Sequence, residues 1–145
     1  MTHIVKRSAL VPFSAEKMYG LVADIPRYPE FLKWCSSVEV IEDKEGEVTA
    51  SLKISFKGLK KSFTTRNCMS PNHSIDMSLV AGPFSHLKGR WIFTALDDNA
   101  SKIELDMNFD FDNVAVAVLV GPVFSYIANH QVDAFYKRAQ ELYGD

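Results

Sequence analysis

Apolar and polar side chains follow a period of two along the segment 103–112, where every odd position is apolar and every even position is polar. This period gives a β-strand one dry face and one wet face. Segments 50–57, 63–69, 75–79 and 87–93 share the period, and SPNHS, AGPFS and DDNAS are turn sequences between them. Residues 58–60 (GLK) are expected to form a further turn. Region 38–112 therefore predicts an antiparallel meander with water on its outer side.

The first 32 residues predict one strand and two short helices. Residues 3–11 (HIVKRSALV) are rich in strand-forming side chains and end at Pro12, which predicts a strand. Ser14 is suited to cap a helix over 14–23, because its hydroxyl can accept a hydrogen bond from a free first-turn amide. Residues 24–32 (DIPRYPEFL) predict a second short helical turn, whose length Pro29 limits.

Residues 114–143 change to the helical period and predict one long helix. Its main stripe consists of Phe124, Ala128, Gln131, Phe135 and Leu142. Gly121-Pro122 predicts a kink or a restart, because proline lacks an amide hydrogen and clashes with the preceding turn. Segment 114–120 (VAVAVLV) is apolar on all sides and should be covered by protein, ligand, partner or lipid.

This order of elements predicts an α+β fold formed by a single domain over residues 1–145. A curved antiparallel sheet of about seven strands would wrap around one long C-terminal helix, with two short helices after the first strand. A sheet that grips one helix from one side leaves a gap near the N-terminal half of that helix. Such a gap is a natural site for an apolar ligand.

Length, charge and cysteine content narrow the classes of function. The 145 residues suit one domain, and the net charge of −2 argues against general nucleic-acid binding and sequence-specific DNA binding. The N-terminus lacks an apolar run of signal-peptide length, and no segment approaches the roughly 20 apolar residues of a membrane span. We therefore expect a cytoplasmic protein in which Cys35 and Cys68 are reduced thiols.

Three segments carry a family resemblance: LVADIPRYPEFLKWC, AGPFSHLKGRWIF and VDAFYKRAQELYG. They resemble the bacterial ribosome-association toxin family, the prokaryotic branch of the coenzyme-Q-binding START-like proteins, also called the oligoketide cyclase and lipid transport group. The resemblance runs from Val5 to Gly144. Lys33 stands where the family usually has a proline, and this difference should loosen the loop by a fraction of a kcal/mol, on the order of 0.5.

The resemblance implies a helix-grip fold and a hydrophobic cavity that binds ubiquinone or another lipid. For the toxin branch it also implies binding to the large ribosomal subunit, which blocks subunit association, and a small antitoxin partner. These are two different functions, and one molecule could perform both.

The inward-facing side chains could line a cavity or simply form a packed core. Thr65 and Asn67 fall on the inner face by alternation, and with Gln131 they could hydrogen-bond a quinone carbonyl or a water. A register slip of one residue would place Thr65 and Asn67 in solvent instead. The candidate cavity residues are Trp34, Phe56, Phe63, Thr65, Asn67, Met77, Trp91, Phe93, Met107, Phe109, Phe124, Gln131 and Phe135.

The hairpin 48–75 is basic and contains no acidic residue before Ile75, whereas segment 97–112 is acidic. Its cations could meet ribosomal RNA phosphates or anionic lipid headgroups at a membrane surface, or could form a solvated face without a partner. The candidate residues of this surface are Lys53, Lys57, Lys60, Lys61 and Arg66.

Catalytic chemistry has little support in the sequence. His130 and Asp133 could interact on one helix and Cys35 could act as a nucleophile, but no motif joins a base to a nucleophile. The four histidines have no metal-ligand spacing. We therefore predict a protein without catalytic residues, metal or cofactor that binds a hydrophobic small molecule. The alternative is a toxin-type protein that binds the large ribosomal subunit through the basic hairpin.

Overall fold

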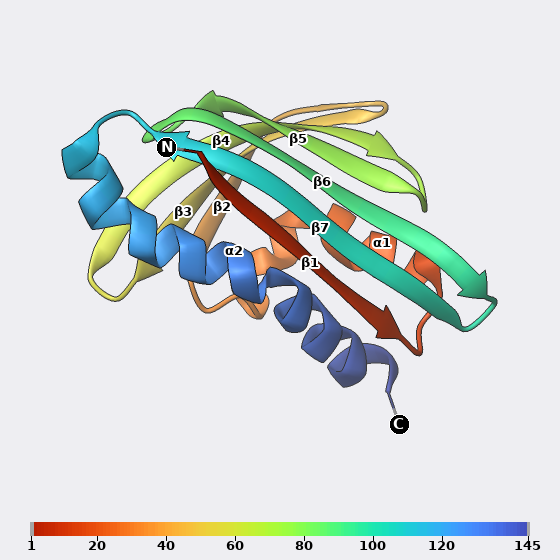
Figure 1. Ribbon diagram of the computed structural model, residues 1–145. Coiled ribbons are helices and arrows are strands. Elements are labelled where there is room, and N and C mark those ends of the chain that lie inside the picture. The colour runs from red at the N-terminus through yellow and green to blue at the C-terminus, as the bar shows by residue number, and fades with distance from the viewer. Residues whose placement is uncertain (1, 145) are drawn as a thin grey trace.

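The computed structural model describes residues 2–144. These residues form a sheet that curves around one long helix (Figure 1). The elements in chain order are β1 His3–Val11, α1 Ala15–Ala23, η1 Ile25–Glu30, β2 Cys35–Lys44, β3 Glu47–Phe56, β4 Leu59–Ser70, β5 Ser74–Ala81, β6 Phe84–Asp97, β7 Ala100–Phe111 and α2 Val114–Tyr143. The predicted order of one strand, two short helices, a run of strands and a long helix is confirmed.

The sheet has the strand order β1-β7-β6-β5-β4-β3-β2, and all neighbouring strands are antiparallel. Consecutive strands from β2 to β7 pair as hairpins, while β1 pairs with β7 at the opposite edge. Helix α2 lies along the concave face, as Figure 1 shows. The α+β class and the seven-stranded curved sheet around a C-terminal helix are therefore both confirmed.

Local signals in the sequence determine the ends of several elements. The Ser14 hydroxyl accepts a hydrogen bond from the Lys17 amide at 3.1 Å, which caps α1 as predicted. The β3–β4 turn lies one residue earlier than predicted, at Lys57-Gly58, where φ is 50° and 82°. Two central residues with positive φ match the twist of a two-residue hairpin, and Gly58 adopts this conformation without steric cost.

One expectation for α2 was wrong in part. The helix does not restart at Gly121-Pro122, because Pro122 removes only one backbone donor and its neighbours hold the helix against the sheet. The VAVAVLV segment is not covered by the described chain, so its coverage by a ligand, partner or lipid stays a prediction. Val114, Val118 and Leu119 are 80%, 68% and 69% exposed, since the sheet contacts only one side of the helix here.

The buried stripe of α2 differs slightly from the predicted one. It contains Val120, Phe124, Ile127, Ala128, Val132, Phe135 and Ala139, whereas Leu142 is exposed beyond the sheet. Helix α2 is also long and apolar enough to span a bilayer by length and composition, contrary to the expectation that no segment would be. In this fold its apolar stripe packs on the sheet instead, as in the core helix of many proteins.

Candidate functional site

A small cavity of about 70 Å³ lies between the concave face of the sheet and the middle of α2. Nine of the candidate cavity residues line it: Trp34, Phe63, Thr65, Asn67, Met77, Trp91, Met107, Phe124 and Gln131. The cavity is far smaller than the roughly 300–1,000 Å³ of typical small-molecule pockets. Most of the aromatic side chains therefore form packed core, and the remaining space suits about two water molecules.

Thr65 and Asn67 provide the polar part of the cavity wall. Both are buried and face inward, so the alternation placed them on the correct side of β4. The Asn67 amide nitrogen donates to the Val48 carbonyl at 3.0 Å, and the Thr65 hydroxyl lies 3.4 Å from the Asn67 amide oxygen. Gln131, which the sequence suggested as their partner, bonds to Trp34 instead.

Three candidate residues lie away from the cavity, in packed aromatic clusters. Phe109 contacts Phe124 at a centroid distance of 4.8 Å, and Phe135 contacts Trp91 at 5.3 Å. Phe93 packs against Trp91 at 6.1 Å. Alternation gave Phe93 and Phe109 the correct face of the sheet, and the helical period gave Phe135 the buried side of α2. Neither period could show where the sheet separates from α2. Phe56 lines a different space, the outer groove described below.

Sequence reasoning missed several residues of the cavity wall. They are Ile25, Tyr28, Leu52, Leu87, Leu105, Ile127 and Ala128. The Tyr28 hydroxyl donates to the Val22 carbonyl, and burial, with smaller effects of Cys35 and Asp24, raises the pKa of Tyr28. The signal that could have found Leu52, Leu87 and Leu105 is their alternation, which puts them on the same face as the candidates.

A larger groove of about 500 Å³ opens on the outside, between the loop after η1 and α2. Its lining residues are Pro29, Glu30, Phe31, Leu32, Lys33, Trp34, Phe56, Tyr126, Ile127, His130, Gln131, Ala134, Lys137, Arg138 and Glu141. Trp34, Ile127 and Gln131 line both this outer groove and the inner cavity. The Trp34 indole nitrogen donates to the Gln131 side-chain oxygen at 2.9 Å, so these two side chains stand between the two spaces.

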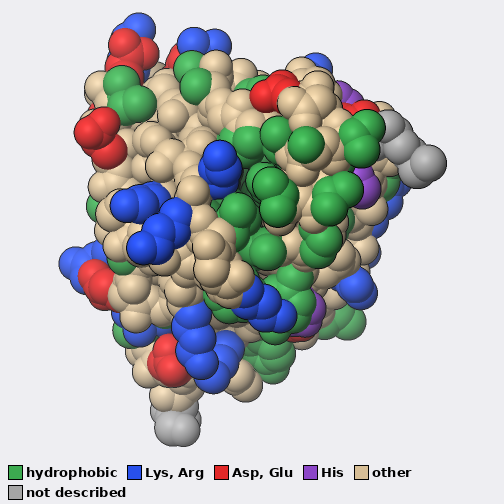
Figure 2. Space-filling view, turned by 90° about the vertical axis from the view of Figure 1, so that its left-hand side faces the viewer, with side chains coloured by type: hydrophobic (Ala, Val, Ile, Leu, Met, Phe, Trp, Pro, Cys, Tyr) green, Lys and Arg blue, Asp and Glu red, His purple; other side chains and the backbone are tan. Residues whose placement is uncertain are grey.

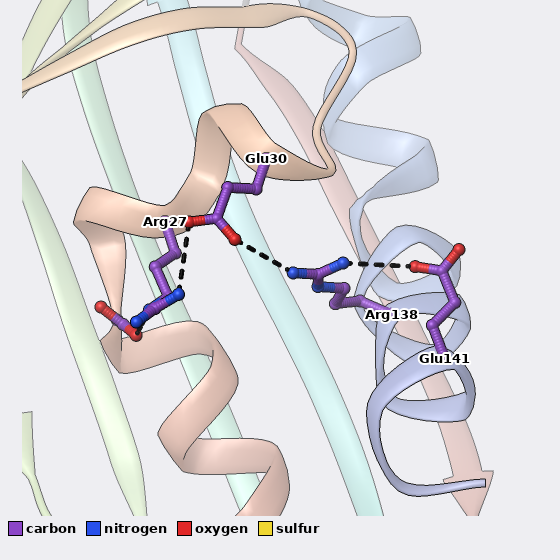
Figure 3. Close-up of polar contacts among 5 residues, drawn as sticks. Arg27, Glu30, Arg138 and Glu141 are labelled. Carbon is purple, nitrogen blue, oxygen red and sulfur yellow. Dashed lines mark hydrogen bonds and ion pairs between the residues drawn. The ribbon is translucent and has the colours of Figure 1, made fainter. Parts of the chain in front are cut away.

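Ion pairs hold one end of the outer groove together. Arg138 on α2 reaches Glu30 at the end of η1 at 3.2 Å and Glu141 at 3.6 Å (Figure 3). Glu30 also pairs with Arg27 at 3.4 Å, and the Arg138 guanidinium lies 5.1 Å from the centre of the Phe31 ring. The network therefore ties η1 to the C-terminal half of α2.

Aromatic rings form the other end of the outer groove. Tyr126 stacks on His130 with centroids 4.0 Å apart, and on Phe56 of β3 at 5.6 Å. The Lys57 ammonium lies 4.8 Å from the centre of the Tyr126 ring, a cation–π distance. The turn between β3 and β4 is thereby anchored to α2.

The basic hairpin is divided between the two faces of the sheet. Lys61 pairs in register with the buried residue Ile54, so it lies on the concave side, whereas Lys53 and Lys60 lie on the convex side. Arg66 pairs with Glu47 at 2.9 Å. The four hairpin lysines, Lys53, Lys57, Lys60 and Lys61, form no ion pair with a carboxylate of residues 2–144. Figure 2 shows Lys and Arg side chains beside a hydrophobic hollow on one face of the molecule.

Among the described residues, no hydrogen bond joins Cys35 to His130 or Asp133. Cys35 is buried at the start of β2, and burial raises the pKa of its thiol to about 11, which disfavours the nucleophilic thiolate. The His130 Nδ1 atom lies 2.7 Å from the Tyr126 carbonyl, within the helix. Both cysteines are free, and Cys68 is exposed on β4.

Comparisons with known proteins agree with this geometry. The sequence profile of the family described as polyketide cyclase/dehydrase and lipid transport matches residues 11–136. The chain is 48% identical to the ribosome association toxin RatA of Pseudomonas aeruginosa, over 99% of both chains. The chain belongs to this family, in its ribosome-association-toxin branch. It is more distantly similar, at 29% identity over 94% of its length, to the mitochondrial coenzyme Q-binding protein COQ10 homolog B of Xenopus laevis, of which it covers 58%.

Solved structures confirm the START-like fold. A START superfamily protein of Mycobacterium smegmatis matches with a TM-score of 0.81 at 18% identity, over 97% of this chain and 99% of that one. The Zhui aromatase/cyclase of Streptomyces sp. R1128 matches with a TM-score of 0.86 at 17% identity, over 97% and 94% of the two chains. At these identities the likeness concerns the fold alone.

Proposed function

We propose that the protein binds the large ribosomal subunit through the lysines of the β3–β4 hairpin and thereby blocks subunit association. The observation that carries this function is the 48% identity over nearly full length to a protein named for ribosome association. We place ribosome binding before the binding of a hydrophobic small molecule, because the inner cavity of about 70 Å³ leaves little room for such a ligand.

The charges of the hairpin suit ribosomal RNA. Lys53, Lys57, Lys60 and Lys61 are exposed, in a chain with a net charge of −2. Concentrated cations on one hairpin can displace counterions from the RNA backbone, and this contribution weakens as salt rises. No base recognition is required for such binding.

Charge reversal tests this function. Lys60→Glu/Lys61→Glu should weaken sedimentation with purified large subunits and reduce the salt slope of binding by about 2, because each lysine neutralises one phosphate of the RNA. The matched control, Lys6→Glu/Lys88→Glu, makes the same change in net charge on β1 and β6. Equal weakening of binding in both variants would show that only overall charge matters, and unchanged binding in both would refute the hairpin assignment.

A second function, binding of a hydrophobic small molecule such as ubiquinone or another lipid, is supported by the outer groove. Its volume of about 500 Å³ lies within the range of small-molecule pockets, and it borders a cavity with polar groups at Thr65 and Asn67. Native mass spectrometry of freshly purified protein, with organic extraction, tests this function. A stoichiometric lipid would support it, and a clean mass without ligand after mild purification would count against it.

Neither function requires catalysis, a cofactor or a metal. We propose a non-catalytic role, which turnover dependent on His130 or Cys35 would refute.

Two further partners are proposed. The family resemblance suggests a small antitoxin partner, and the exposed apolar start of α2 suggests a peripheral membrane contact. Co-purification of a small protein encoded nearby would test the first, and flotation with anionic vesicles would test the second.

A further inference from the structure

The inner cavity and the outer groove are separated by two side chains from distant parts of the sequence. Trp34 follows η1 and Gln131 lies on α2, and their hydrogen bond of 2.9 Å spans 97 positions. Both residues, together with Ile127, line the space on either side. Rotation of the indole away from Gln131 would therefore join the two spaces.

The backbone around Trp34 is firmly held, so opening would require only side-chain motion. The Trp34 carbonyl accepts from the Ser55 amide at 2.8 Å, and the Leu32 amide donates to the Tyr28 carbonyl at 2.8 Å. Within residues 2–144, the bond to Gln131 is the one hydrogen bond of the indole nitrogen. The indole ring also forms an offset stack on Phe63, with a centroid distance of 6.5 Å.

The far end of the cavity has adaptable walls. Met77 and Met107 fill the dent over Gly89, where an added Cβ would lie 2.6 Å from the Met77 methyl carbon and 3.2 Å from Met107 Cγ. Methionine side chains are flexible and fill irregular spaces. The cavity can therefore enlarge by rearrangement of these two side chains, without a shift of the sheet.

The charged side chains that line the outer groove favour an anionic ligand. Arg138 is paired with Glu30 and Glu141, whereas Lys33 and Lys137 have no carboxylate partner among the described residues. Two free ammonium groups beside an aromatic and aliphatic floor suit a molecule with an anionic head and an apolar tail. A neutral molecule would form no ion pair with these two ammonium groups.

We propose that the outer groove binds an amphipathic anion whose head meets Lys33 and Lys137 and whose tail displaces Trp34 from Gln131 to enter the inner cavity. This inference narrows the second function proposed above and rests on it. The head could be a carboxylate or a phosphate monoester, because both present anionic oxygens to an ammonium group.

Titration of the purified protein with laurate, dodecyl phosphate and dodecanol, each below its micelle concentration, tests the proposal. Tryptophan emission reports binding, because Trp34 moves on opening, and the Trp34→Phe variant identifies its share of the signal. The two anions should bind, and Lys33→Ala/Lys137→Ala should weaken them about tenfold or more while changing dodecanol little. Lys6→Ala/Lys88→Ala is the control with the same charge change.

The role of the hydrogen bond is tested by Gln131→Leu, which keeps the side-chain size but cannot accept from the indole. Laurate should associate several-fold faster with this variant in stopped-flow measurements. Unchanged association would overturn the gate, and anion binding indifferent to Lys33 and Lys137 would overturn the head-group site. If dodecanol or ubiquinone bound with the same affinity in every variant, this inference would fail while hydrophobic-ligand binding survived. If no compound bound the wild-type protein, both would fail.

Discussion

The two halves of α2 perform different tasks, although they belong to one uninterrupted helix. In the C-terminal half, Phe135 is completely buried among Tyr28, Phe31 and Trp91, and Ala139 is also completely buried. In the N-terminal half, Val118 and Leu119 face solvent, and the outer groove begins only at Tyr126 and follows the outer side of the helix to Glu141. The comparison shows that the helix has a closed end, which packs against the sheet and η1 on its inner side, and an open end at its first turns, which the sheet covers on one side only.

The largest effect is expected in the closed half. Phe135→Ala should reduce the free energy of unfolding by about 3–5 kcal/mol, because a buried ring surrounded by three aromatic side chains leaves a cavity that cannot collapse fully. Urea unfolding followed by circular dichroism measures the loss. A loss below about 1 kcal/mol would show that this end is not the stable part of the interface.

A smaller effect is expected where the two halves meet. Gln131→Leu removes the acceptor of the Trp34 indole and should reduce the free energy of unfolding by about 1–2 kcal/mol, since the indole nitrogen loses its partner. The same urea experiment measures this change, with Gln140→Leu on the exposed side of α2 as the control. An unchanged stability would mean that the indole readily finds water, and that the closed position of Trp34 is not held by this bond.

The closed end also predicts a dependence of stability on alkaline pH. Burial raises the pKa of Cys35 from 9.0 to about 11, so the neutral thiol favours the folded state. This contribution to the free energy of unfolding is complete below about pH 9 and is lost as the pH rises toward 11. The loss at pH 10 is about 1 kcal/mol. Cys35→Ala should flatten the fall in stability between pH 8 and pH 10. An equally steep fall in Cys35→Ala would assign it to other groups, such as Tyr28, whose pKa burial also raises.

The smallest effect is expected at the open end. Leu119→Ser should change the free energy of unfolding by less than about 0.5 kcal/mol, because the side chain is 69% exposed and contributes little to the core. A loss comparable to that of Phe135→Ala would remove the contrast between the two halves. Unchanged stability combined with altered binding to ribosomes or vesicles would sharpen it.

Much of the fold could be predicted from the sequence because its patterns are local. The alternation at 103–112, the Ser14 cap and the helical period after residue 113 each act over a few residues. The path of α2 through Pro122 could not be predicted in the same way, because packing on the sheet outweighs the loss of one hydrogen bond.

The site was less accessible to sequence reasoning. Alternation placed Thr65 and Asn67 on the inner face. It also assigned Phe109 to a cavity that it does not reach, as the helical period did for Phe135. The outer groove joins Lys33 to Lys137 and Trp34 to Gln131, which lie about a hundred residues apart in the chain. Only the curvature of the sheet around α2 brings these side chains together, and no local pattern records that curvature.

The most direct test of the central claim is a subunit-joining experiment with purified ribosomal subunits, followed by light scattering and by sucrose-gradient sedimentation. If the protein blocks subunit association, it should migrate with the large subunit, not the small one, and added protein should reduce the amount of joined ribosomes, with a weaker effect at high salt. Joined ribosomes in unchanged amount, with the protein at the top of the gradient at low salt, would contradict it.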